Sequence, residues 1–142
     1  MIVLDTNVVS ELMRVVPAPQ VVAWLQHNAD RDLATTAVTV AEIRYGITRL
    51  PSGRRRATLA AAADEIFTAF PDQILPFDLA AAHAYADIVS HRDGLGTPIE
   101  GFDAQIAAIC RTRAADLATR NEKDFTDTGI TIINPWQPDP AA

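Results

Sequence analysis

Three acidic residues and one polar segment of this 142-residue chain lie where an α/β protein gathers its functional groups. Asp5 follows a short apolar run, Glu42 follows a second β-prone run, and Asp103 lies near the start of an amphipathic stretch. Asn121 and Asp124 follow a third apolar run. Functional groups in open parallel sheets collect beyond the carboxyl ends of the strands. We therefore expect these side chains to meet at one edge of a sheet.

A group of carboxylates in one place favours a metal site. Neighbouring carboxylates repel each other unless they are protonated or neutralised by a cation. Hard cations such as Mg²⁺ or Mn²⁺ prefer oxygen ligands, and such ions can activate water and offset charge on a phosphodiester. Thr6, Asn7 and Thr119 are candidates for hydrogen bonds that orient the ligands.

Each position also has a simpler structural explanation. Asp5 is a candidate helix N-cap, and for this residue alone the two explanations are even. Thr39 and Glu42 match a capping box, which makes a cap the stronger explanation for Glu42 by itself. Asp103 interacts favourably with a helix N-terminus, although that does not explain why it shares a side with apolar residues. The segment of Asn121 and Asp124 also suits an Asx turn.

The apolar pattern predicts strands that alternate with helices along one domain, residues 1–142. Strands are expected at residues 2–4, 32–38, 74–77, 116–119 and 130–133. Helices are expected near residues 8–14, 20–28, 39–50, 54–70, 78–92 and 100–113. Such alternation favours an α/β fold with a mostly parallel sheet covered by helices on both faces. A short Pro-rich C-terminal tail is expected from about residue 135.

The composition narrows the classes of function. The formal net charge of −6 argues against nucleic-acid binding through a broad basic face. Cys110 is the only cysteine, which excludes an internal disulfide and a cysteine-built metal site. No apolar run is long enough to span a membrane, and no secretory signal is expected. We therefore expect a soluble, cytoplasmic protein.

Four segments in this order resemble the PIN-domain ribonuclease toxins of the VapC/FitB-like type. The matching segments are VLDTNVVSEL, TAVTVAEIRYGI, GFDAQIAAIC and LATRNEKDF, followed by INPW. The resemblance implies a three-layer α/β/α fold with a five-stranded sheet. It also implies an endoribonuclease that hydrolyses RNA with Mg²⁺ or Mn²⁺, a cognate antitoxin and a homodimer.

The resemblance also assigns roles to residues. Asp5, Glu42 and Asp103 match the three main acids of the family, and Asp5 and Asp103 are the first choices as metal ligands. A fourth acid often follows the fourth strand, but Asn121 stands at that position here, with Asp124 three residues further on. Either Asp124 completes the site or Asn121 serves as a neutral ligand or orienting group.

The sequence leaves open whether the chain is catalytic and which arginine contacts a phosphate. The alternative function is a PIN-like module of weak or no catalysis that acts by binding a protein or RNA. A phosphatase of the HAD type is disfavoured because Asn7 stands where that class needs a second Asp. One of Arg111, Arg113 and Arg120 is a candidate for contacting a phosphate, with surface solubility as the equal alternative.

Overall fold

The computed structural model describes residues 1–137, and five strands in this range form one parallel sheet. Its strands are β1 (Ile2–Leu4), β2 (Leu33–Thr36), β3 (Ile74–Leu75), β4 (Asp116–Ala118) and β5 (Ile132–Ile133). Their order is β3-β2-β1-β4-β5, and every neighbouring pair is parallel. The predicted sheet is thus confirmed, and β1 lies at its centre, flanked by β2 and β4.

Helices connect the strands, as the alternating pattern predicted. Within residues 1–137 they are α1 (Thr6–Leu12), α2 (Pro19–His27), α3 (Ala37–Thr48), α4 (Arg54–Thr68), α5 (Leu79–Gly94), α6 (Gly101–Thr112) and the short 3₁₀ helix η1 (Glu122–Phe125). The second strand ends earlier than the predicted 32–38, because Thr36 already caps α3 by accepting the amide of Thr39 at 3.0 Å.

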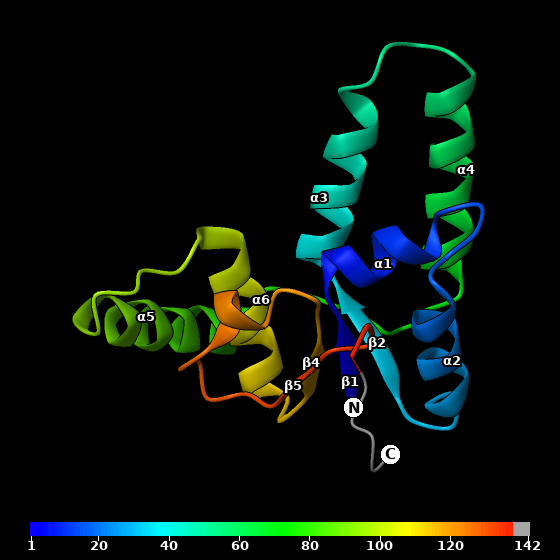
Figure 1. Cartoon of the computed structure of the whole chain (residues 1–142). Coiled ribbons are helices and arrows are strands. Elements are labelled where there is room, and N and C mark those ends of the chain that lie inside the picture. The colour runs from blue at the N-terminus through cyan, green and yellow to red at the C-terminus, as the bar shows by residue number, and fades with distance from the viewer. Residues whose placement is uncertain (138–142) are drawn as a thin grey trace.

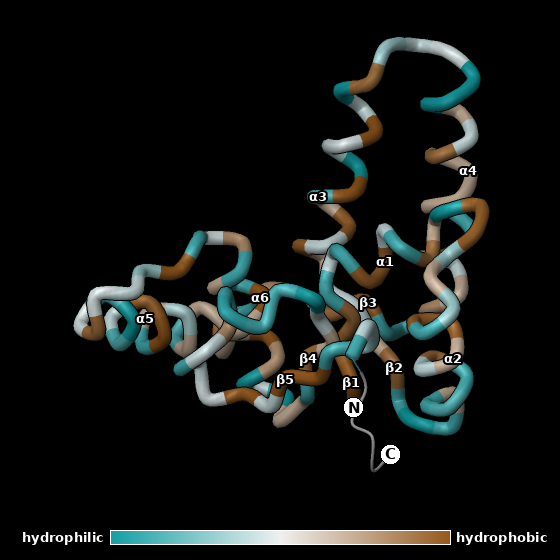
Figure 2. Tube along the Cα trace, in the orientation of Figure 1, coloured by the Kyte–Doolittle hydropathy of each residue, from teal (hydrophilic) through white to brown (hydrophobic). Residues whose placement is uncertain are grey.

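Helices cover both faces of the sheet, so the fold has the predicted three layers. Side chains of a strand alternate between the two faces. Ile2 and Leu4 therefore pack into the core under α1–α4, whereas Val3 packs into the core formed with α5 and α6. Figure 1 shows the two helical layers on opposite sides of the strands, and Figure 2 shows the apolar residues along the central strands.

A buried arginine holds the connection that follows β4. Arg92 of α5 is only 5% exposed, and its guanidinium donates hydrogen bonds to three carbonyl oxygens, those of Thr97, Asp124 and Thr126. These bonds satisfy the buried charge without a carboxylate partner. They tie η1, and with it the segment that follows β4, to the helical layer of α5 and α6.

Two further features concern membrane-spanning helices and the C-terminal tail. No helix of residues 1–137 is both long and apolar enough to cross a lipid bilayer. The expected Pro-rich tail from about residue 135 lies mostly outside the described residues, which end at Gln137.

Candidate functional site

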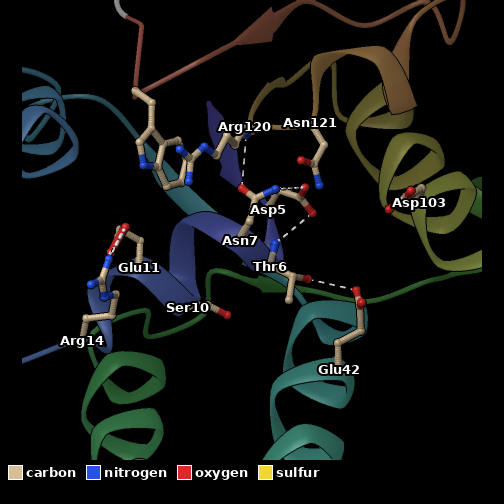
Figure 3. A pocket seen from close by; sticks show the side chains of 11 residues that line it. Asp5, Thr6, Asn7, Ser10, Glu11, Arg14, Glu42, Asp103, Arg120 and Asn121 are labelled. Atoms are coloured by element: carbon tan, nitrogen blue, oxygen red, sulfur yellow. Dashed lines mark hydrogen bonds and ion pairs between the residues drawn. The ribbon is translucent and has the colours of Figure 1, made fainter. Parts of the chain in front are cut away.

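An open cavity of about 600 Å³ lies at the carboxyl edge of the sheet. Asp5 comes to it from the end of β1, Asn121 from the end of β4, Glu42 from α3 and Asp103 from α6. Figure 3 shows these side chains arranged around the same hollow. The parallel strands thus bring together residues that are up to 116 positions apart in the chain.

Asp5 is the most deeply buried carboxylate of the cavity, at 4% exposure. Its backbone amide donates to the Ala118 carbonyl at 2.9 Å, which ties the end of β1 to the end of β4. One carboxylate oxygen accepts the Thr6 amide at 2.8 Å and caps α1. The other accepts the Thr119 hydroxyl at 2.8 Å and the Asn7 amide group at 3.3 Å. Asp5 therefore caps a helix and lines the cavity at once.

A small polar network supports Asp5 from the β4 side. The Thr119 hydroxyl, while donating to Asp5, accepts the Asn7 side-chain amide at 3.1 Å and the Asn121 backbone amide at 3.1 Å. The Asn7 carbonyl oxygen accepts the Arg120 backbone amide at 3.2 Å. Hydrogen bonds of this kind hold the side chains of metal ligands in one orientation. The orienting roles of Asn7 and Thr119 stay predictions, which this geometry supports.

Glu42 faces the cavity instead of capping its helix, and the capping box of Thr39 and Glu42 is wrong. The helix begins at Ala37, so the cap is Thr36 and Glu42 lies in the second turn. The Thr39 hydroxyl bonds with those of Thr36 and Thr6. Glu42 instead accepts the Thr6 hydroxyl at 2.9 Å.

Asp103 is likewise free of a capping role. The carboxylate of Glu100 caps α6 by accepting the amides of Phe102 and Asp103 at 3.0 and 3.1 Å. Asp103 is half-buried and lines the cavity. Its neighbour Phe102 in the first turn is 47% exposed.

Burial and mutual repulsion raise the pKa of all three carboxyls. Desolvation is the largest cause in each case. Burial and then the charges of Asp5, Glu100, Asp124 and Glu42 raise the pKa of Asp103 to about 7.

Hydrogen bonds act in the opposite direction on the other two acids. Donors on Thr119 and Thr6 offset part of the rise in the pKa of Asp5, and the Thr6 hydroxyl does so for Glu42. Ionisation of these carboxyls therefore costs folding free energy, and a bound cation would reduce that cost.

The donor set fits a hard divalent cation in its chemistry. Every group is an oxygen donor, and among residues 1–137 no Lys or Arg lies within ion-pair distance of Asp5, Glu42 or Asp103. In this same part of the chain, no three His, Cys, Asp or Glu side chains have converged into a ligand set. The carboxylates thus surround a shared cavity, and Glu42 and Asp103 would have to turn towards Asp5 to share one ion.

At the fourth position the two candidate residues, Asn121 and Asp124, lie in different places. Asn121 lines the cavity, whereas Asp124 is exposed, does not line it and lies in η1. Asp124 acts from a greater distance, because its charge still raises the pKa of Asp5 and Asp103. The amide of Asn121 is thus the group that occupies the place where the family often has an acid.

Some cavity residues escaped the sequence analysis. The carboxylate of Glu11 is buried and receives Nη1 of Arg14 at 3.1 Å, and both residues line the cavity with Trp136. Asn7 and Glu11 are four positions apart on α1 and share one helical face, and this spacing is a signal that could have revealed Glu11. Arg14 follows the end of that helix. Trp136 had no such local signal, because it reaches the cavity only through the pairing of β5 with β4.

Comparisons with known proteins show the family. The model of the PIN domain matches residues 2–130. This chain belongs to the PIN domain family. Among relatives of this PIN domain, VapC ribonuclease Y4jK of Sinorhizobium fredii is 40% identical over 139 residues, which are 97% of this chain and 99% of the relative. Toxin FitB of Neisseria gonorrhoeae is 38% identical, covering 96% and 99% of the two chains.

A solved structure agrees with this assignment. The structure of FitAB bound to an IR36 DNA fragment contains a chain that is 36% identical to this PIN domain, with a TM-score of 0.91 and full coverage of both chains. The α/β/α fold inferred from the four segments is therefore confirmed.

Proposed function

We propose that this PIN domain is the toxin of a toxin–antitoxin pair and hydrolyses RNA with Mg²⁺ or Mn²⁺. The observation that carries the proposal is the meeting of Asp5, Glu42 and Asp103 at one cavity, where their pKa values are raised and no Lys or Arg of residues 1–137 lies within ion-pair distance of them. The similarity to a VapC ribonuclease and to Toxin FitB supports the choice of RNA and of a toxin.

In this proposal Asp5 and Asp103 hold the ion, and Glu42 holds it directly or through water. When bound, a divalent ion lowers the pKa of a coordinated water and offsets charge on the phosphodiester. Thr119 and Asn7 fix the orientation of Asp5, and Thr6 fixes that of Glu42. Asn121 acts as a neutral ligand or orienting group.

We also propose three partners or settings by similarity. The chain binds a cognate antitoxin, and its similarity to a structure from the VapBC family of toxin–antitoxin systems, 27% identical with a TM-score of 0.67, supports this. A guanidinium of that partner would complement the carboxylates of the cavity. A homodimer and a cytoplasmic location complete the proposal.

The decisive experiment measures RNA cleavage by the full chain after chelation and after return of Mg²⁺ or Mn²⁺. Asp5→Asn and Asp103→Asn should each abolish cleavage and reduce the heat of metal binding. Asp93→Asn is the matched control, because Asp93 is exposed on α5 and does not line the cavity. Cleavage that persists in excess chelator, or that survives both site variants, would contradict the proposal.

The second candidate is a PIN-like module with weak or no catalysis that acts by binding a protein or RNA. Asn121 in place of an acid and the open arrangement of the carboxylates favour it. RNA binding without cleavage at any metal concentration would support this candidate over the first. Asn121→Asp also distinguishes the two candidates. If catalysis is weak because Asn121 replaces an acidic ligand, this variant should cleave RNA faster than the wild type.

A further inference from the structure

The cavity contains two arginines, and only one of them is engaged by a carboxylate. Nη1 of Arg14, two residues beyond the end of α1, lies 3.1 Å from a carboxylate oxygen of Glu11 in that helix. Among residues 1–137, no carboxylate lies within ion-pair distance of Arg120. Arg120 therefore presents a positive charge to a cavity whose lining includes four carboxylates.

Two contacts hold Arg120 in place. Its backbone amide donates to the side-chain oxygen of Asn7 at 3.2 Å, which fixes the start of the side chain beside Asp5. Its guanidinium carbon lies 5.0 Å from the ring centroid of Trp136, a cation–π arrangement. Trp136 in turn packs against the core under α1–α4. The guanidinium is thus ordered in advance, and less side-chain entropy is lost when it binds a ligand.

The position of Arg120 separates it from the other two arginines of this region. Arg111 lies against Gly129 and lines a separate pocket with His91. Arg113 is exposed at the end of α6 and does not line the cavity. Figure 3 shows Arg120 and Glu42 on opposite sides of Asp5. Of the three arginines left open by the sequence, the structure selects Arg120.

The guanidinium of Arg120 offsets the repulsion between the acidic cavity and a negatively charged substrate. A phosphodiester that enters the cavity meets four carboxylates in a protein of net charge −6. A planar guanidinium donates two parallel hydrogen bonds to phosphate oxygens. Because Arg120 forms no ion pair with a carboxylate of residues 1–137, those carboxylates stay free for a cation.

We propose that Arg120, stacked on Trp136, binds a backbone phosphate of the RNA strand and positions that strand across the carboxylates. The inference rests on the proposed RNA hydrolysis and adds its substrate-positioning residue. It places one ion-pair contact of the substrate on the β4 side of the cavity, next to Asn121. The contact acts on binding of the strand, and the carboxylates act on the phosphodiester that is cut.

The test compares Arg120→Gln and Arg120→Lys with the wild-type chain and with Arg113→Ala as control. Binding of a short single-stranded RNA is measured in chelator over a range of salt, and cleavage is measured with Mg²⁺ or Mn²⁺. Arg120→Gln should raise Kd and KM about 10- to 100-fold with kcat nearly unchanged, because a charge-assisted contact is lost. The slope of log Kd against log salt should fall by about 0.7, the value for one phosphate of a single strand.

Conservative variants show whether the loss of binding follows the loss of the contact itself. Arg120→Lys should lie between Gln and wild type, and Trp136→Phe should bind better than Trp136→Ala, since each conserves part of the contact. A salt slope equal to that of Arg113→Ala, or a loss of kcat at constant KM, would overturn the inference. A lowered melting temperature with unchanged Kd would also overturn it and give Arg120 a purely structural role. Wild-type chain that binds and cleaves no RNA would overturn this inference and the proposed function together, whereas cleavage unaffected by Arg120→Gln overturns the inference alone.

Discussion

Replacing Asp103 by Asn should stabilise the metal-free protein at pH 8. In the folded chain the pKa of Asp103 is raised to about 7 from an ordinary value of 3.8. The unfolded chain has the ordinary value, so the ionised carboxylate costs folding free energy above pH 7. The cost shrinks as the pH falls through 7 and vanishes below about 4. Lower pH therefore stabilises the metal-free wild type across this window.

The size of the effect follows from the pKa. A difference of about three pH units corresponds to about 4 kcal/mol at about 1.4 kcal/mol per unit. Asp103 is only half-buried, and water screens much of this cost. We expect the free energy of unfolding of Asp103→Asn to exceed that of the wild type by about 1–2 kcal/mol at pH 8.

Urea unfolding in chelator, followed by tryptophan fluorescence, measures the difference at pH 8 and pH 5. The gain should be less than half as large at pH 5, because the wild-type carboxyl is protonated there in the folded state. Asp93→Asn should show neither the gain nor its pH dependence, and added Mg²⁺ should stabilise the wild type more than Asp103→Asn. A variant no more stable than the wild type at pH 8, or an equal gain at both pH values, would refute the reasoning.

Three further substitutions test the groups that hold the site. Thr119→Val should lower the free energy of unfolding by about 1–3 kcal/mol in urea titrations, because the buried Asp5 loses a donor. Thr119→Ser keeps the hydroxyl and should not lower it, and an equal loss of stability in both variants would contradict this prediction. Arg92→Met should lower the free energy of unfolding by about 3–5 kcal/mol, since three carbonyl oxygens lose their donor. Amide hydrogen exchange should then become faster in residues 121–126. Unchanged exchange there would contradict the idea that Arg92 holds this segment in place. Thr6→Val should reduce RNA cleavage about tenfold, because Glu42 loses its 2.9 Å hydrogen bond. Thr6→Ser should retain cleavage, and full activity in the Val variant would make that bond irrelevant to catalysis.

The sequence by itself determined the order of the elements and the acids at their ends. Alternating apolar runs predicted the strands, because burial on both faces of a parallel sheet requires continuous apolar residues. The helix expected near residues 78–92 is observed as α5, and the carboxylate of Asp78 caps it by accepting the Ala81 amide at 3.0 Å. Such features depend on residues close together in the chain, which is why a local pattern reveals them.

Only the tertiary structure decided which side chains share the cavity. Thr39 and Glu42 satisfy the local pattern of a capping box, yet the end of β2 shifts the cap to Thr36 and frees Glu42 to bond with Thr6 from another helix. The pairing of β4 with β1 places Asn121 at the cavity and leaves Asp124 outside it. In the same way, Arg111 and Arg113 lie at the C-terminal end of α6, whereas Arg120 follows the carboxyl end of β4, so that of these three arginines Arg120 alone lines the cavity. The physical reason is that these contacts join residues distant in the chain, whose proximity arises from strand pairing and helix packing and not from their own spacing.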